Sequence, residues 1–148
     1  SIRAEVDRRG DGVLVSCGDR FSGYAFFVVD GHLVHDYNAA GTHHVVRSES
    51  PVPTGPVTLE YRFGKTGQLE GTFELYVDGQ RVASEHRSGT LAYHLSPTGV
   101  TVGRSPVSAP SDLYEAPFAF AGDIARVVIE LGDDRTPSVP TAITALDD

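Results

Sequence analysis

A cysteine followed by an arginine is the first place where the sequence could do chemistry. The stretch from Cys17 to Arg20 is Cys-Gly-Asp-Arg, and a cationic neighbour can stabilise a thiolate for nucleophilic or phosphoryl-transfer chemistry. A loop that cradles phosphate would need more glycines and backbone amides before the arginine. Because Cys17 instead closes the apolar run 13–17, we predict that it is a buried small hydrophobic residue.

Six histidines raise the question of a zinc site. They are His32, His35, His43, His44, His86 and His94. Side chains of a strand alternate between its two faces, so residues an odd number of positions apart point to opposite faces. His43 and His44 therefore diverge, and so do His32 and His35. Solvated or hydrogen-bonded histidines are therefore expected, while a metal site built across two strands stays open.

Acidic residues gather near the predicted turns, where carboxylate and carbonyl oxygens could hold calcium. These acids are Asp7, Asp11, Asp112, Glu115, Asp123, Asp133 and Asp134. No spaced loop signature selects a set among them. We therefore expect this chain to carry no cofactor of its own, while calcium binding stays open.

Aromatic rings and amides on a concave sheet could bind carbohydrate, because sugars stack on aromatic faces and hydrogen-bond to amides. The candidates are Tyr24, Tyr37, Asn38, Tyr93 and Tyr114. The chain contains no Trp, the residue on which sugars most often stack, and this weakens the interpretation.

Paired carboxylates on one strand would instead indicate glycoside hydrolysis, as in jelly-roll glucanases that carry Glu-x-Asp-x-x-Glu. Glu5 and Asp7 begin that pattern, but its third member falls on Gly10. A glycosidase is therefore the weaker alternative.

The elements that must position these residues are strands joined by tight turns. Asp30-Gly31 and Asp78-Gly79 each separate two β-rich runs. Asp-Gly suits both central positions of a type I′ turn, where φ is positive. The sequence therefore predicts β-hairpins over 24–38 and 73–83.

Alternation and apolar runs predict further strands. Residues 1–7 and 57–63 alternate between apolar and polar side chains, which is typical of strands with one buried face, whereas the apolar run 13–17 favours a strand covered on both faces. Prolines mark 50–56 as a surface connection. We expect 64–71 to be a polar loop.

These elements together predict an all-β fold, an antiparallel β-sandwich, since no segment shows a sustained 3.6-residue period. A chain of 148 residues with 40% hydrophobic content suits one domain. We expect this domain to span 1–131. Residues 132–148 would form a Pro-containing acidic tail or a strap across the domain.

The charge of the chain limits its partners. It carries 12 Lys+Arg against 20 Asp+Glu, a net charge of -8, which repels phosphate backbones and anionic lipid surfaces. Neither a nucleic acid nor a membrane partner is expected. The single Cys17 allows no internal disulfide, and the compartment, cytoplasmic or exported, is left open. A strand beginning at Ser1 without an initiator Met suggests a piece of a longer protein or a processed precursor.

Several short motifs follow one another in a characteristic order along residues 1–131. They are Gly12-Val13-Leu14-Val15, Gly18-x-x-Phe21-x-Gly23-Tyr24, Asp30-Gly31-x-Leu33-Val34-x-x-Tyr37-Asn38, Leu75-Tyr76-Val77-Asp78-Gly79-x-x-Val82 and Tyr114-x-x-Pro117-Phe118-x-Phe120-x-Gly122-x-Ile124. This order resembles the C-terminal region of bacterial arylsulfatases, and the last motif is its most specific part.

The resemblance implies a concanavalin A-like jelly roll, similar in shape to laminin-G modules, that follows the sulfatase catalytic domain in the same polypeptide. Its role would be non-catalytic: docking on that domain or shaping access to its cleft. Sulfatases use the first residue of a Cys/Ser-x-Pro-Ser/Ala-Arg motif, which is oxidised to formylglycine and acts together with a metal ion. Cys17 lacks that context, so the nucleophile would lie outside this chain. Calcium in the sandwich or in the parent enzyme stays open, and a lectin-like module is the alternative.

Overall fold

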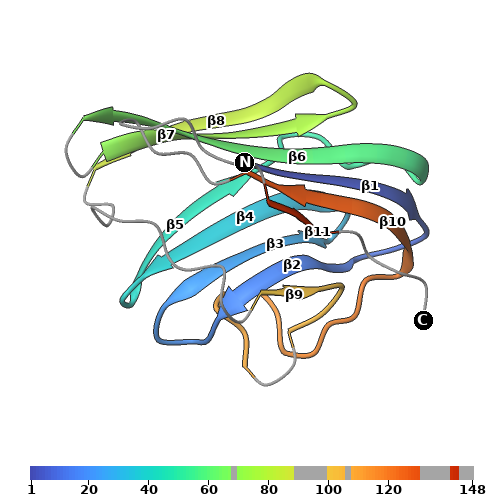
Figure 1. The fold of residues 1–148 in the computed structure, drawn as a ribbon, viewed down its shortest axis with the longest axis horizontal. Coiled ribbons are helices and arrows are strands. Elements are labelled where there is room, and N and C mark those ends of the chain that lie inside the picture. Colours follow the sequence, from blue (N-terminus) through green and yellow to red (C-terminus); the bar gives the residue numbers. More distant parts are fainter. Residues whose placement is uncertain (68–69, 89–99, 106–107, 131–140, 144–148) are drawn as a thin grey trace.

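The fold is an all-β antiparallel sandwich of two sheets (Figure 1). The computed structural model describes residues 1–67, 70–88, 100–105, 108–130 and 141–143. Within those ranges the regular secondary structure is entirely strand, as the absence of helical periodicity predicted. This described part of the chain accordingly contains no helix long and apolar enough to span a lipid bilayer.

Each sheet combines strands that are distant in sequence. The six-stranded sheet has the order β11 (Thr141–Ile143), β10 (Gly122–Ile129), β1 (Ile2–Arg8), β6 (Gly55–Gly67), β7 (Glu70–Val77) and β8 (Gln80–Ser88). The five-stranded sheet has the order β5 (Thr42–Arg47), β4 (His32–Ala39), β3 (Gly23–Val29), β2 (Gly12–Gly18) and β9 (Thr101–Val102). The connection predicted at 50–56 carries the chain from one sheet to the other, but it ends at residue 54, because Gly55 and Pro56 already pair with β1 as part of β6.

Both predicted Asp-Gly hairpins are confirmed. Asp30 and Gly31 have φ values of 50° and 77°, and Asp78 and Gly79 have φ values of 50° and 82°. Positive φ at both central residues is the signature of the type I′ turn, whose twist matches the strands it joins. The turns therefore set the β3–β4 and β7–β8 pairings.

The alternating strands also keep their predicted register. In β1 every second residue from Ile2 to Arg8 is buried and the residues between are exposed. In β6, Val57, Leu59 and Tyr61 are buried, whereas Arg62 is exposed. These inward residues form the main core between the sheets with β3, β4 and β7 residues such as Phe26, Leu33 and Phe73.

The loop predicted at 64–71 is wrong. β6 continues to Gly67 and pairs with β7 through Gly64↔Thr72 and Lys65↔Gly71, with a bulge between Lys65 and Gly67. Ladder hydrogen bonds to a neighbouring strand outweigh the weak β-propensity of glycine, and the bulge absorbs the irregularity.

The five-stranded sheet is covered on both faces, which explains the apolar run in β2. Its inner face contacts the six-stranded sheet. On its outer face Val13, Ala25, Phe27 and Val34 form a second apolar cluster, against which Tyr114 and Phe118 pack. The part of the chain that holds Tyr114 and Phe118 thus lies over the sheet and brings the 110–113 loop to its outer face.

Candidate functional site

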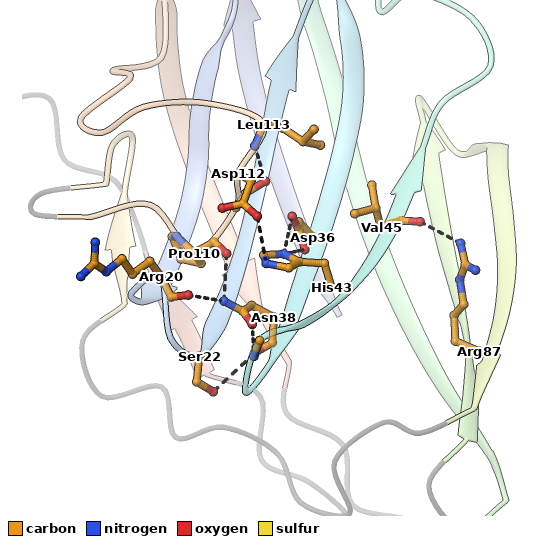
Figure 2. Close-up of polar contacts among 12 residues, drawn as sticks. Arg20, Ser22, Asp36, Asn38, His43, Val45, Arg87, Pro110, Asp112 and Leu113 are labelled. Atoms are coloured by element: carbon orange, nitrogen blue, oxygen red, sulfur yellow. Dashed lines mark hydrogen bonds and ion pairs between the residues drawn. The ribbon is translucent and has the colours of Figure 1, made fainter.

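Polar groups gather on the outer face of the five-stranded sheet, beside the 110–113 loop (Figure 2). Nδ1 of His43 on β5 lies 2.9 Å from Oδ1 and 3.1 Å from Oδ2 of Asp36 on β4. The opposite ring nitrogen, Nε2, lies 3.4 Å from Oδ2 of Asp112. One imidazole therefore connects two carboxylates, one from the sheet and one from the loop.

The turn between β4 and β5 explains why Asp36 and His43 lie side by side. Ala40 and Gly41 have φ values of 51° and 99° and leave Ala39 opposite Thr42. That register places Asn38 opposite His43 and Asp36 opposite Val45. Asp36 and His43 are therefore diagonal neighbours on the same face of the sheet, within reach of each other.

The three side chains differ in exposure. Asp36 is only 1% exposed, whereas the His43 side chain is 23% exposed and that of Asp112 is 87% exposed. An ionised carboxylate can only accept hydrogen bonds, so His43 Nδ1 donates to Asp36. The imidazole is thereby held with Nε2 directed toward Asp112 and the solvent.

Asn38 fastens two loops beside this cluster. Its Nδ2 donates to the carbonyl oxygens of Arg20 at 2.8 Å and Pro110 at 3.2 Å, and its Oδ1 accepts from the Gly41 amide at 2.7 Å. The side chain is fully buried. One amide group therefore anchors the 19–22 loop, the 110–113 loop and the β4–β5 turn.

These two loops carry the large hydrophobic residues that are exposed within the described part of the chain. Phe21 is 66% exposed and Leu113 is 48% exposed. Asp19 Oδ1 accepts from the Phe21 amide at 2.8 Å, and Ser111 Oγ accepts from the Leu113 amide at 3.1 Å. We name Arg20, Phe21, Asp112 and Leu113 the loop-junction surface. Exposed apolar side chains are able to contact a partner, although single ones are common on protein surfaces.

The residues predicted to bind carbohydrate lie on two different faces. Tyr24 and Tyr37 pack against the main core between the sheets, whereas Asn38 and Tyr114 lie on the outer side of the five-stranded sheet. Tyr93 lies outside the described residues. The structure therefore does not gather the described candidates into one aromatic platform, and sugar binding by this set stays a prediction.

Tyr114 fastens the segment that covers the outer face. Its ring meets Phe27 edge-on with centroids 4.7 Å apart. Its hydroxyl lies 2.6 Å from Ser105 Oγ, which donates to Ser16 Oγ at 2.9 Å. Burial raises the pKa of Tyr114, so the phenol stays protonated and able to donate.

The histidines separate between the two faces, as alternation predicted. His35 and His44 are buried on the side of the main core, where they contact Phe73, while His43 faces Asp36 on the outer side. The expectation of solvated or hydrogen-bonded histidines is not met at His35 Nδ1 and His44 Nε2, which are buried with no hydrogen-bond partner among the described residues. His94 lies outside the described residues. Within the described ranges, no three His, Cys, Asp or Glu side chains converge as ligands of one metal ion.

Three of the acids considered for calcium have separate partners. Asp11 Oδ1 accepts from Arg8 Nη2 and from the Gly31 amide. Asp123 pairs with Arg9, and Asp112 pairs with His43. Asp133 and Asp134 lie outside the described residues.

Cys17 is buried, as its place in an apolar run predicted. Burial raises the pKa of its thiol. The thiol form is therefore favoured over the nucleophilic thiolate, and Cys17 lies on β2 opposite Tyr24.

Comparison of the sequence with protein-family models and with curated proteins gave no match. The motif order described above therefore stands as a resemblance, and the family is a matter for proposal.

Sequence reasoning missed the Asp36–His43–Asp112 cluster. The signal for its inner half was present, because a two-residue turn at Ala40-Gly41 fixes which side chains of β4 and β5 share a face. Asp112 lies far along the chain, in a loop that only the packing of Tyr114 and the hydrogen bond to Pro110 bring to this face.

Proposed function

We propose that this chain is a non-catalytic accessory domain of an arylsulfatase-like sulfuric ester hydrolase, with a concanavalin A-like jelly-roll topology. Its role is to dock on the catalytic domain of the same polypeptide and narrow access to its cleft. The observation that carries the proposal is the loop-junction surface, where Phe21 and Leu113 are held outward by loops anchored on Asn38.

The motifs behind the resemblance support a structural role. Gly23 comes so close to β2 that a Cβ would collide with the Cys17 carbonyl oxygen, and a Cβ on Gly122 would collide with the carbonyl oxygen of Asp7. The Asp-Gly pairs form the turns, and Asn38 anchors the loops. Motif residues with these functions build a scaffold and do not need to touch a substrate.

The state of Cys17 agrees with a non-catalytic role. A thiol that is buried on the inner side of β2, with its pKa raised by burial, is poorly placed to attack a sulfate ester. The chain alone should therefore not hydrolyse a chromogenic aryl sulfate. Turnover that disappears in a Cys17→Ala variant would overturn the non-catalytic interpretation.

Docking itself can be tested with the parent enzyme divided into two parts. Hydrogen–deuterium exchange of the backbone amides of this chain is measured with and without the catalytic domain, and the rates are compared at 19–22 and 110–113. We expect slower exchange in both loops and weaker association in a Phe21→Ser, Leu113→Ser double variant. Arg126→Ser, an exposed change on β10 of the other sheet, serves as the control. Protection confined to the other sheet would place the docking surface elsewhere.

Carbohydrate binding is the second candidate function, and one observation favours it at the same surface. An exposed aromatic ring, Phe21, and an exposed carboxylate, Asp112, lie on the two loops that Asn38 joins. Rings and carboxylates of this kind can stack on and hydrogen-bond to sugars. Titration with neutral and sulfated oligosaccharides, repeated with Phe21→Ser, distinguishes this role from docking.

A further inference from the structure

We infer that His43 and Asp112 form a binding site for one divalent transition-metal ion of the zinc class. The site lies on the outer face of the five-stranded sheet, between β5 and the 110–113 loop (Figure 2). The proposed site shares Asp112 with the loop-junction surface, whereas His43 and Asp36 lie outside that surface.

The first argument is the direction of the imidazole nitrogens. Nδ1 of His43 donates its hydrogen to Asp36, so in the neutral ring the lone pair is on Nε2. That lone pair faces Oδ2 of Asp112, which is also an electron-pair donor, at 3.4 Å. A cation between the two atoms stabilises this arrangement: a proton on Nε2 makes it an ion pair, and a metal ion that displaces the proton would bind both atoms.

The second argument is the separation of those two atoms. Zinc binds imidazole nitrogen at about 2.0–2.1 Å and carboxylate oxygen at about 2.0–2.2 Å, with tetrahedral angles, so neighbouring ligand atoms lie roughly 3.3–3.5 Å apart. The 3.4 Å between His43 Nε2 and Asp112 Oδ2 matches this edge. The mixed nitrogen and oxygen ligands suit zinc better than calcium, which takes oxygen ligands.

The third argument is the carboxylate behind the ring. A histidine that ligates a metal usually donates its other N–H to a carboxylate or carbonyl, which fixes the tautomer and makes the ligating nitrogen more basic. Asp36 occupies that place and is almost completely buried. His86 provides a contrast, because its Nε2 lies 3.8 Å from Glu70 and 3.0 Å from Thr66 Oγ1, and no buried carboxylate contacts its ring in the described part of the chain.

The loop that carries Asp112 is held before any ligand arrives. Asn38 binds the carbonyl oxygen of Pro110, and Ser111 accepts from the Leu113 amide, so the backbone is fastened on both sides of Asp112. With two protein ligands, water completes the coordination, and binding is weaker than at a structural zinc site. The net charge of -8 raises the local concentration of cations.

The test is calorimetric titration of the whole chain with zinc chloride at pH 7.5. We expect one zinc ion per chain. His43→Gln should abolish binding and Asp112→Asn should weaken it at least tenfold, while Asp36→Asn should weaken it by about 10–100-fold through the orientation of the ring. Excess calcium should not displace the zinc. A cobalt-substituted sample should show visible absorption bands that are lost in His43→Gln.

His86→Gln is the matched control and should leave the zinc affinity unchanged. Should Asp36→Asn fail to fold, the exposed Asp112→Asn variant still decides the matter. Absence of zinc binding, or zinc binding that survives both His43→Gln and Asp112→Asn, would overturn the proposal. So would loss of zinc in His86→Gln.

Discussion

The imidazole of His35 lies flat on the phenol ring of Tyr61, with parallel planes and centroids 3.5 Å apart. His35 projects from β4 and Tyr61 from β6, so the pair joins the two sheets at the centre of the sandwich. Both residues are buried, and Nδ1 of His35 has no hydrogen-bond partner among the described residues. The stack places a titratable ring where only its neutral form is tolerated.

His35 should make folding sensitive to acid. Burial lowers its pKa from 6.5 to about 3, so between these values the unfolded chain binds a proton that the folded chain does not. The contribution of neutral His35 to the free energy of unfolding should therefore be complete above pH 6.5. Below pH 6.5 the free energy of unfolding should fall by about 1.4 kcal/mol per pH unit. Urea unfolding of the wild type and His35→Phe from pH 7 to pH 4.5 measures the two slopes. The variant should be flatter, and equal slopes would contradict this assignment.

Two glycines with positive φ should differ in their response to alanine. At Gly79, with φ of 82°, a Cβ would meet nothing within 4 Å. Gly79→Ala should therefore cost only the backbone strain, about 1–2 kcal/mol. At Gly23, a Cβ would collide with backbone atoms of β2, so we expect a clearly larger loss from Gly23→Ala. Thermal unfolding of the two variants compares them directly.

Gly31→Val in the other Asp-Gly turn should cost about 1 kcal/mol or more.

Loss of the Asn38 amide should loosen both loops of the loop-junction surface. Asn38→Ala leaves the carbonyl oxygens of Arg20 and Pro110 and the Gly41 amide without this partner. We expect a loss of about 2–4 kcal/mol in the free energy of unfolding, because each unsatisfied buried group costs about 1–3 kcal/mol. Amide exchange should accelerate at 19–22 and 110–113. Asn38→Asp keeps the acceptor for Gly41 but not the donors, so restored stability in that variant would show that the loops do not depend on the amide.

Cys17 should react slowly with a thiol reagent in the folded chain. It is buried and its pKa is raised by that burial, so little thiolate is accessible at neutral pH. Labelling with a chromogenic disulfide in native buffer and in denaturant gives the ratio of rates. We expect labelling in native buffer to be slower by at least tenfold, on the order expected when reaction needs an opening of the sandwich. Comparable rates would mean that the thiol is accessible.

The strands and tight turns follow from local sequence. Alternation from Ile2 to Asp7 and from Val57 to Phe63 determines which residues are buried, because successive side chains of a strand point to opposite faces. Asp30-Gly31 and Asp78-Gly79 determine the hairpins, because few residue pairs accept positive φ twice in succession. The burial of Cys17 was likewise predictable from the apolar run that it ends. None of these features requires knowledge of a distant partner.

Only the tertiary structure decided what depends on residues distant in sequence. The pairing of β6 with β7 extends β6 through Gly64, which local propensity assigned to a loop. The covered outer face of the five-stranded sheet separates Tyr114 from Tyr24, although both are tyrosines in β-rich sequence. Asp112 reaches His43 because Tyr114 packs on Phe27 and Asn38 holds Pro110. The physical reason is the same in each case: a contact between distant segments forms only when packing returns enough free energy to offset the entropy of closing the intervening chain, and a local pattern contains no record of that balance.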